Sequence, residues 1–283
     1  LSLDSDTIVA QNYLEKIYEN FLKKDIALAN IFFEHNIESC KVSEEVNAIS
    51  SYELHLRYYR AALKYSGFPY YYHTLGSAFA VRASTYALQG GMNKRKAGED
   101  FYFLHKLFSL NKNIEISDTC VYPSPRISDR VPFGTGASMR QLSKVSGEIF
   151  FLTYSLNAFL DLKNLFSKVS LFYRIKEIQL IKEVDSLNIP LKNFLQTVDF
   201  ADVINEINKN SSNTDSFNKR FFNFFNGFRV MKYLNYSHIE HYHRSKTETQ
   251  AKHLAEILTT GKIFSEDCQS LLKFYIGLEK GNI

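Results

Sequence analysis

The sequence contains few of the residue types that mark specialised protein classes. Its 283 residues include no tryptophan, three cysteines and five prolines. Cys40, Cys120 and Cys268 are far apart and lack metal-ligand spacing, so they predict neither a zinc site nor a disulfide framework. We therefore expect reduced thiols in a cytoplasmic protein.

Long apolar runs and a strong net charge are also lacking. The longest apolar run, residues 149–162, contains Asn157 and Asp161 and is shorter than the roughly 20 residues of a membrane-spanning helix. The formal net charge of +4 is spread along the chain and indicates no nucleic-acid partner. It suits an anionic donor or a membrane surface equally, so peripheral association at the inner face of a membrane stays open, as does the oligomeric state.

The composition instead indicates a folded protein with a substantial core. Hydrophobic residues make up 45% of the chain and aromatic residues 15%, all of them Phe or Tyr. Such a composition argues against disorder. The length permits one large domain or two modest ones.

The order of apolar patterns predicts an α/β fold followed by a mostly helical region. In the first half we expect helices over residues 12–22, 49–63 and 100–108, and strands over residues 27–33, 70–81 and 114–122. This alternation is typical of an α/β layer. Beyond residue 141 we expect a polar loop over residues 208–218 and helices over residues 150–166, 171–184, 190–207, 221–236, 251–258 and 265–278.

Two carboxylates follow a short apolar segment at the start of the sequence. Alternation along an expected strand places Asp4 and Asp6 on the same side. Two such oxygen ligands suit Mn²⁺ or Mg²⁺ with attached phosphates, although acidic residues at this spacing are more often a solvated turn. The alternative chemistry is that of haloacid-dehalogenase phosphotransferases, with Asp4 as nucleophile and Asp6 as acid/base. Ile8 stands where that family has a small residue, which disfavours this alternative.

A second acidic pair, Glu99 and Asp100, opens an expected apolar helix. Acidic residues are common in first turns because they complement the helix dipole. The functional interpretation is that Asp100 accepts the proton of an attacking hydroxyl, which is a poor nucleophile without a positioned base. A glycine-bounded segment, residues 76–84, lies between the two acidic pairs. This order of features suggests sugar transfer from a nucleotide donor.

In this order the motifs resemble the later part of a family 2 glycosyltransferase with a GT-A fold. Residues 3–6 (Leu-Asp-Ser-Asp) are similar to its DxD metal motif, residues 76–82 to its acceptor-side strand, and residues 98–100 (Gly-Glu-Asp) to its ED motif. The resemblance covers roughly the first half of the chain. It implies an α/β, partial GT-A-like catalytic domain over residues 1–140, followed by a mostly α-helical region of unknown role over residues 141–283.

The resemblance also implies an activity, a cofactor and substrates. The activity is metal-dependent, inverting glycosyl transfer with Mn²⁺ or Mg²⁺, in which Asp6, with Asp4 nearby, would hold the metal. Asp100 would be the catalytic base, and Glu99 would orient the acceptor or its loop. The donor would be a nucleotide sugar, and the acceptor would be a carbohydrate or lipid-linked hydroxyl, as in cell-surface polysaccharide synthesis.

Further residues are assigned to the acceptor and to the leaving group. Gly76, Ser77 and His73 would border the acceptor, although a lone histidine is more often packed in the core. A basic, proline-bounded loop carries Arg126 and Arg130. Either arginine would neutralise the departing diphosphate, because a guanidinium group matches phosphate oxygens. The alternative is an exposed loop with solvated charges.

Two departures from the family pattern limit the expected activity. In that family the strands that bind the nucleotide precede the DxD motif, whereas this sequence begins at the motif. We therefore expect part of the catalytic domain to be missing and this chain alone to be inactive. The Gln-x-x-Arg-Trp signature of processive members is also lacking, which predicts the transfer of one or a few sugars. The rival interpretation is a non-catalytic binding or assembly module.

Overall fold

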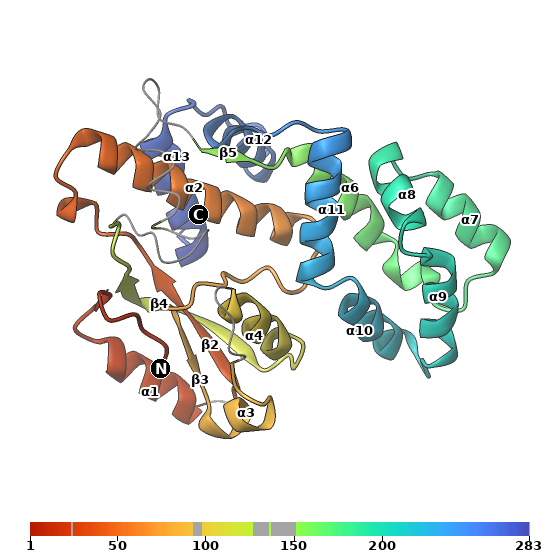
Figure 1. Ribbon diagram of the computed structural model, residues 1–283, viewed down its shortest axis with the longest axis horizontal. Helices are drawn as coiled ribbons and strands as arrows, with labels where there is room; N and C mark the ends of the chain where they lie inside the picture. The colour runs from red at the N-terminus through yellow and green to blue at the C-terminus, as the bar shows by residue number, and fades with distance from the viewer. Residues whose placement is uncertain (24, 93–97, 127–135, 137–150, 283) are drawn as a thin grey trace. The chain divides into compact units, whose positions relative to one another are not determined.

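The computed structural model describes residues 1–23, 25–92, 98–126, 136 and 151–282. The chain divides into two compact units that are each discontinuous in sequence (Figure 1). The first unit contains Leu1–Tyr58, Tyr72–Leu152 and Lys246–Ile283, and the second contains Tyr59–Tyr71 and Thr153–Ser245. The first unit contains residues from before and after residue 140. The division into a catalytic domain and a helical region at that residue stays a prediction.

The first unit is built on a four-stranded mixed sheet with the strand order β1-β4-β2-β3. The central strands β2 (Leu28–Phe33) and β4 (Asn113–Tyr122) are parallel. The outer strands β1 (Ile8–Val9) and β3 (Phe79–Val81) run antiparallel to their neighbours. Every residue of β2 is buried, as expected for a strand that is covered on both faces. The α/β class predicted from the sequence is confirmed.

Helices of the first unit come from three stretches of the chain. They are α1 (Tyr13–Lys23), the short 3-10 helix η1 (Ile37–Ser39), α2 (Ser43–Tyr65), whose end belongs to the second unit, α3 (Ala83–Leu88), α4 (Glu99–Phe108), α12 (Thr247–Leu258) and α13 (Cys268–Lys280).

Helices α1 and α4 cover opposite faces of the sheet (Figure 1). Apolar residues at helical spacing in α1 direct Tyr13 and Ile17 onto the face of β2 that carries Ile31. On the other face, the Phe79 ring lies 6.2 Å from the Phe103 ring of α4. Because both faces are covered, the ends of the strands are the parts of the sheet that can meet a ligand.

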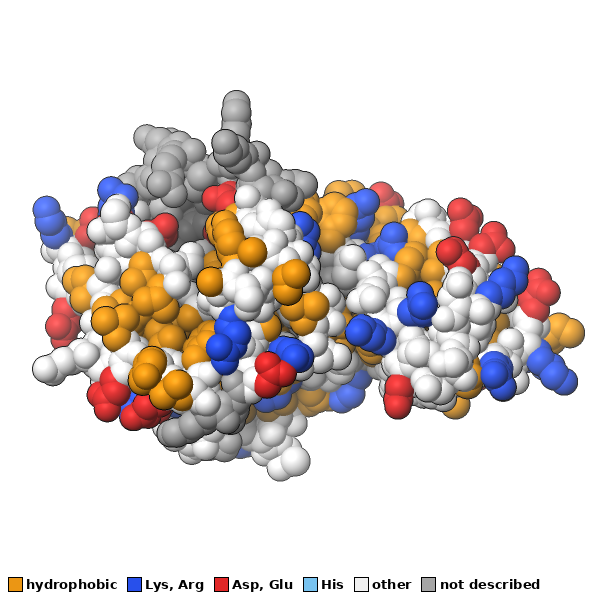
Figure 2. Space-filling view, turned by 90° about the horizontal axis from the view of Figure 1, so that it is seen from below, with side chains coloured by type: hydrophobic (Ala, Val, Ile, Leu, Met, Phe, Trp, Pro, Cys, Tyr) orange, Lys and Arg blue, Asp and Glu red, His pale blue; other side chains and the backbone are white. Residues whose placement is uncertain are grey.

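Helix α1 also carries an apolar stripe that faces solvent. Leu14, Tyr18 and Leu22 follow one another at intervals of four residues, and each is about two-thirds exposed. Figure 2 shows apolar side chains gathered on this side of the first unit. Helix α1 therefore has apolar residues on two adjacent faces, and the sheet covers one of them.

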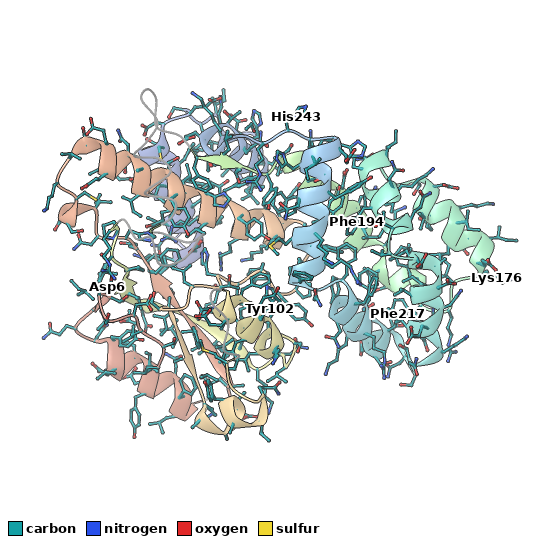
Figure 3. The ribbon with its side chains drawn as sticks, viewed as in Figure 1. Asp6, Tyr102, Lys176, Phe194, Phe217 and His243 are labelled. Atoms are coloured by element: carbon teal, nitrogen blue, oxygen red, sulfur yellow. The ribbon has the colours of Figure 1, made fainter. Side chains whose placement is uncertain are left out.

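The second unit is helical, which agrees with the helical region expected late in the chain. Its rings pack closely: Phe221 stacks on Phe225 with ring centroids 6.0 Å apart, and the Phe194 ring lies 6.5 Å from the Phe225 ring. The Phe217 ring makes a separate contact with the Tyr173 ring at 5.9 Å (Figure 3 labels Phe194 and Phe217). No helix among the described residues has the length and apolar character needed to cross a membrane. The helices are α6 (Leu156–Ser167), η2 (Val169–Phe172), α7 (Glu177–Asp185), α8 (Ile189–Gln196), α9 (Phe200–Lys209), α10 (Thr214–Phe224) and α11 (Gly227–Glu240).

A buried carboxylate joins several segments of the second unit. Asp161 of α6 is 1% exposed and accepts hydrogen bonds from the Tyr233 hydroxyl at 2.7 Å, from the Tyr242 hydroxyl at 3.0 Å and from the Asn188 amide. Burial and the nearby Asp161 carboxylate raise the pKa of Tyr242 to about 12, so the hydroxyl remains a donor. These donors offset the cost of burying the charge.

Some element boundaries expected from the sequence are wrong. Only the last three residues of the expected strand 70–81 pair as β3. The first residues form no strand: Ser2 makes one isolated bridge to Phe79, and the chain then turns. The helix expected over residues 190–207 is two helices, because Asp199 between them has a left-handed φ of 48°.

A candidate active site at the carboxyl edge of the sheet

The described residues that were predicted to act belong to segments that meet at one edge of the sheet. Because β2 and β4 are parallel, their carboxyl ends at Phe33 and Tyr122 lie at this edge. Ile8 pairs with Tyr122 and Phe79 pairs with Asn30, so the antiparallel strands β1 and β3 begin there. In open α/β sheets, ligands bind outside the carboxyl ends of the strands.

Asp4 and Asp6 lie in the segment that leads into β1. They occupy a turn in which the Thr7 amide donates to the Asp4 carbonyl at 3.1 Å, so strand alternation does not place the two carboxylates. Both residues are exposed, and Figure 3 shows Asp6 beside the sheet. Asp6 forms an ion pair with Nε of Arg126, which follows β4. A predicted metal ligand and a predicted phosphate ligand therefore meet.

The protein ligands available to a divalent cation here are few. No cluster of three or more His, Cys, Asp or Glu side chains suited to a metal occurs in the described part of the chain. Two exposed carboxylates fit a cation that completes its coordination with water and substrate phosphates, which is a common arrangement for Mg²⁺. They do not fit a site built from protein ligands alone. Metal binding through Asp6 would require Arg126 to release this carboxylate.

Asp100 and Gly76 are in direct contact. A Cβ on Gly76 would lie 2.2 Å from Oδ2 and 2.6 Å from Cγ of Asp100, so no other residue fits while the carboxylate keeps this position. The Ser2 hydroxyl donates to the Gly76 carbonyl at 2.6 Å. Ser77, the next residue, is buried. The predicted base and the predicted acceptor-side segment therefore belong to one site.

The first turn of α4 positions both acidic residues of the second pair. Gly98 precedes the helix with a φ of 78°, a conformation that glycine adopts without strain. Glu99 and Asp100 follow in the first turn, where the helix dipole favours negative charge. The Oε2 atom of Glu99 is buried and has no hydrogen-bond partner among the described residues. Such an atom can accept a hydrogen bond from a bound hydroxyl.

His73 is packed rather than open. Its ring meets the Phe33 ring edge-on at 4.9 Å, and its Nε2 lies 3.0 Å from Oε1 of Glu279 in α13. The Asn30 side chain donates to the His73 carbonyl at 2.9 Å. These contacts fix the start of the segment that leads to Gly76.

A buried ionic cluster beneath this edge was not predicted. Arg57 of α2 is fully buried and donates to Glu53, to Glu279 and to the Phe33 carbonyl. Burial raises the pKa of Glu53, but Arg57 and His35 outweigh it and hold the pKa at about 2. The spacing of Glu53 and Arg57 on an expected helix was the available signal. Nothing in the sequence pointed to Glu279.

Two expectations from the sequence remain. Arg130 lies outside the described residues. The Glu99–Asp100 pair opens a helix and does not follow a strand, which disfavours the phosphotransferase alternative.

The comparisons with known proteins give one match. The family model described as "Glycosyl transferase family group 2" matches residues 1–177. Neither a curated protein nor a solved structure matches the chain significantly. The matched residues include Asp4, Asp6, Gly76 and Asp100, and they end before the last six helices.

Proposed function

The chain belongs to glycosyl transferase family group 2, and on this premise we propose that it is a metal-dependent, inverting transferase that adds one or a few sugars. Its substrates are a nucleotide-sugar donor and an acceptor. The proposed acceptor is a carbohydrate or lipid-linked hydroxyl in cell-surface polysaccharide synthesis, and the proposed location is the cytoplasm, at the inner face of the membrane. The spread positive charge is compatible with that location.

The contact between Asp100 and Gly76 carries the proposal. A carboxylate at the start of α4 lies against a backbone that has no side chain, beside the segment with Asp4 and Asp6. In the proposed reaction, Asp100 takes the proton of the acceptor hydroxyl as its oxygen attacks the anomeric carbon. The bond from that carbon to the diphosphate breaks on the opposite side, so the configuration inverts.

The other residues have supporting roles in this proposal. Glu99 offers a buried oxygen that can orient the acceptor hydroxyl. Arg126 exchanges Asp6 for the leaving diphosphate, where its charge is needed as the bond breaks. A divalent cation held by Asp6 and Asp4 would supply further neutralisation of the diphosphate. Ser77 is buried and His73 is packed against Glu279, so both would support the acceptor side without direct contact with the acceptor.

A donor screen on the natural full-length protein tests this proposal. We would supply nucleotide sugars with Mn²⁺ or Mg²⁺ and measure release of the nucleoside diphosphate, with and without candidate acceptors. Release that requires the metal and that EDTA abolishes is the expected result. Metal-independent release would remove the metal from the proposal. No turnover of any donor, together with retained acceptor binding, would favour the non-catalytic binding module.

A further inference from the structure

Helix α13 comes from the far end of the sequence, yet it reaches the edge of the sheet that carries the candidate site. It lies in the first unit, outside residues 1–177 that the family model matches. The Lys280 amine at its last turn is 2.8 Å from Oε1 of Glu34, which directly follows β2. Its buried Tyr275 donates to the Ala251 carbonyl of α12. The helix is therefore fixed at its middle and at its end.

Both oxygens of the Glu279 carboxylate of α13 make polar contacts. Oε2 accepts from Nη1 of Arg57 at 2.5 Å, and Oε1 lies 3.0 Å from Nε2 of His73. The Glu279 side chain is 7% exposed. Charged hydrogen bonds between buried groups hold geometry more firmly than exposed pairs do. One carboxylate thus links α2 to the segment that contains His73.

His73 in turn begins the segment that meets the proposed base. Gly76 follows three residues later, and its contact with Asp100 leaves no room for a Cβ. From β2, the Asn30 side chain holds the His73 carbonyl and the Phe33 ring meets the His73 ring, while Glu279 contacts Nε2 of that ring. A shift of His73 would therefore reach Gly76 through a short stretch of chain.

We propose that Glu279 is a positioning residue of the transferase site: it holds His73 so that the segment with Gly76 and Ser77 keeps its place beside Asp100. This inference rests on the proposed function and extends the working part of the domain to α13, beyond the matched family region. Glu279 acts through His73 and touches no substrate. Its removal should affect the acceptor side more than the donor side, because His73 begins the segment with Gly76, whereas the ion pair of Asp6 with Arg126 lies on other segments.

The test compares Glu279→Ala with Lys280→Ala as the matched control. Both changes remove an ion pair of the last turn of α13, but Lys280→Ala leaves His73 untouched. With a donor and an acceptor found by the screen, Glu279→Ala should lower kcat/KM for the acceptor by about tenfold or more, as misplacement of a reacting group does. In Glu279→Ala the KM for the donor should change by less than about twofold. In Lys280→Ala both kcat/KM for the acceptor and the KM for the donor should change by less than about twofold.

Two further variants guard against loss of folding. His73→Phe keeps an aromatic ring against Phe33 and leaves Arg57 paired, but it removes the bond to Glu279. It should reproduce the acceptor defect, and the double variant His73→Phe/Glu279→Ala should be no worse than the more severe single one, because the two residues act as a unit. Additive defects, or equal defects in Glu279→Ala and Lys280→Ala, would overturn the inference while leaving the transferase proposal intact.

Hydrogen–deuterium exchange gives a readout that needs no activity. In Glu279→Ala, amides of residues 72–79 should exchange faster, while those of α6 and α11 keep their rates. Lys280→Ala should leave residues 72–79 unchanged. A protein that turns over no donor would refute the proposed function. Separately, unchanged exchange rates at residues 72–79 in Glu279→Ala would refute the positioning role.

Discussion

The Asp100 carboxylate occupies the space that a side chain at residue 76 would need, since a Cβ on Gly76 would lie 2.2 Å from Oδ2. Gly76→Ala should therefore displace Asp100 by a side-chain rotation and lower turnover by about 10²-fold, with little change in the melting temperature. Gly261→Ala is the contrasting variant, because Gly261 has a φ of 97° and open space around it. It should lower stability and keep activity. Equal activity of Gly76→Ala and the unaltered protein would contradict a working contact.

Asp100→Asn should separate proton transfer from binding. The amide has nearly the same size but accepts no proton, so turnover should fall about 10²–10⁴-fold while the KM for the donor stays close to its original value. Asp118→Asn, at an exposed position on β4, is the control and should behave as the unaltered protein does. Steady-state kinetics with the donor found by the screen would measure both. Turnover of Asp100→Asn within a few-fold of the unaltered protein would place the base elsewhere.

Arg126 should matter more for turnover than for stability. The Arg126 side chain is largely exposed in its ion pair with Asp6. Loss of this ion pair should therefore lower the free energy of unfolding by less than about 1 kcal/mol. If Arg126 meets the leaving diphosphate, Arg126→Ala should lose about 2–3 kcal/mol of transition-state stabilisation. Arg126→Lys should recover only part of this, because lysine lacks the bidentate fork. Unchanged kinetics in both variants would show that the segment with Arg126 only connects β4 to the following part of the chain.

The buried Glu53 should make the first unit sensitive to acid. Its pKa is about 2 in the folded protein, lowered from its ordinary 4.5, so the unfolded chain binds the proton more readily. The resulting stabilisation is present above pH 4.5 and is lost as the pH falls from 4.5 toward 2. It amounts to about 3 kcal/mol at 1.36 kcal/mol per pKa unit. Urea unfolding at several pH values should show this slope, and Glu53→Gln should flatten it.

Asp161 should dominate the stability of the second unit. Asp161→Ala leaves the donors of Tyr233, Tyr242 and Asn188 without their acceptor in a buried place. We expect a loss of about 3–4 kcal/mol in unfolding free energy from urea titration, since unsatisfied buried donors cost about 1–3 kcal/mol each and partly rearrange. Asp185→Asn removes an exposed ion pair with Lys192 and should cost less than about 0.5 kcal/mol. Similar losses in both variants would argue against a structural role for the buried cluster.

The sequence predicted the elements whose signals are local. The apolar spacing of α1 and α4, the continuous apolar run of β2 and the glycine before Glu99 are all readable without the rest of the chain. The order of acidic pairs around Gly76 also led to the correct family. These features depend on helix and strand periodicity and on first-turn chemistry, which a single stretch of sequence contains.

The features that the sequence did not predict depend on distant partners or on single backbone angles. Residues 70–78 look like a strand but have polar contacts in place of a ladder, such as the bond from Asn30 to His73. The break at Asp199 depends on one left-handed residue that no glycine marks. The ion pair of Asp6 joins residues far apart in sequence, and its existence depends on the register of β1 and β4.

The bond between Arg57 and Glu279 spans 222 residues of chain. During synthesis, Arg57 leaves the ribosome long before Glu279. The buried charges of the first unit are therefore balanced only after α13 has been made. A fragment that ends with the family match at residue 177 would lack Glu279, so the buried Arg57 guanidinium would lose one of its carboxylate partners. Helix α13 thus completes the ionic contacts of a site whose recognisable motifs precede it in the sequence.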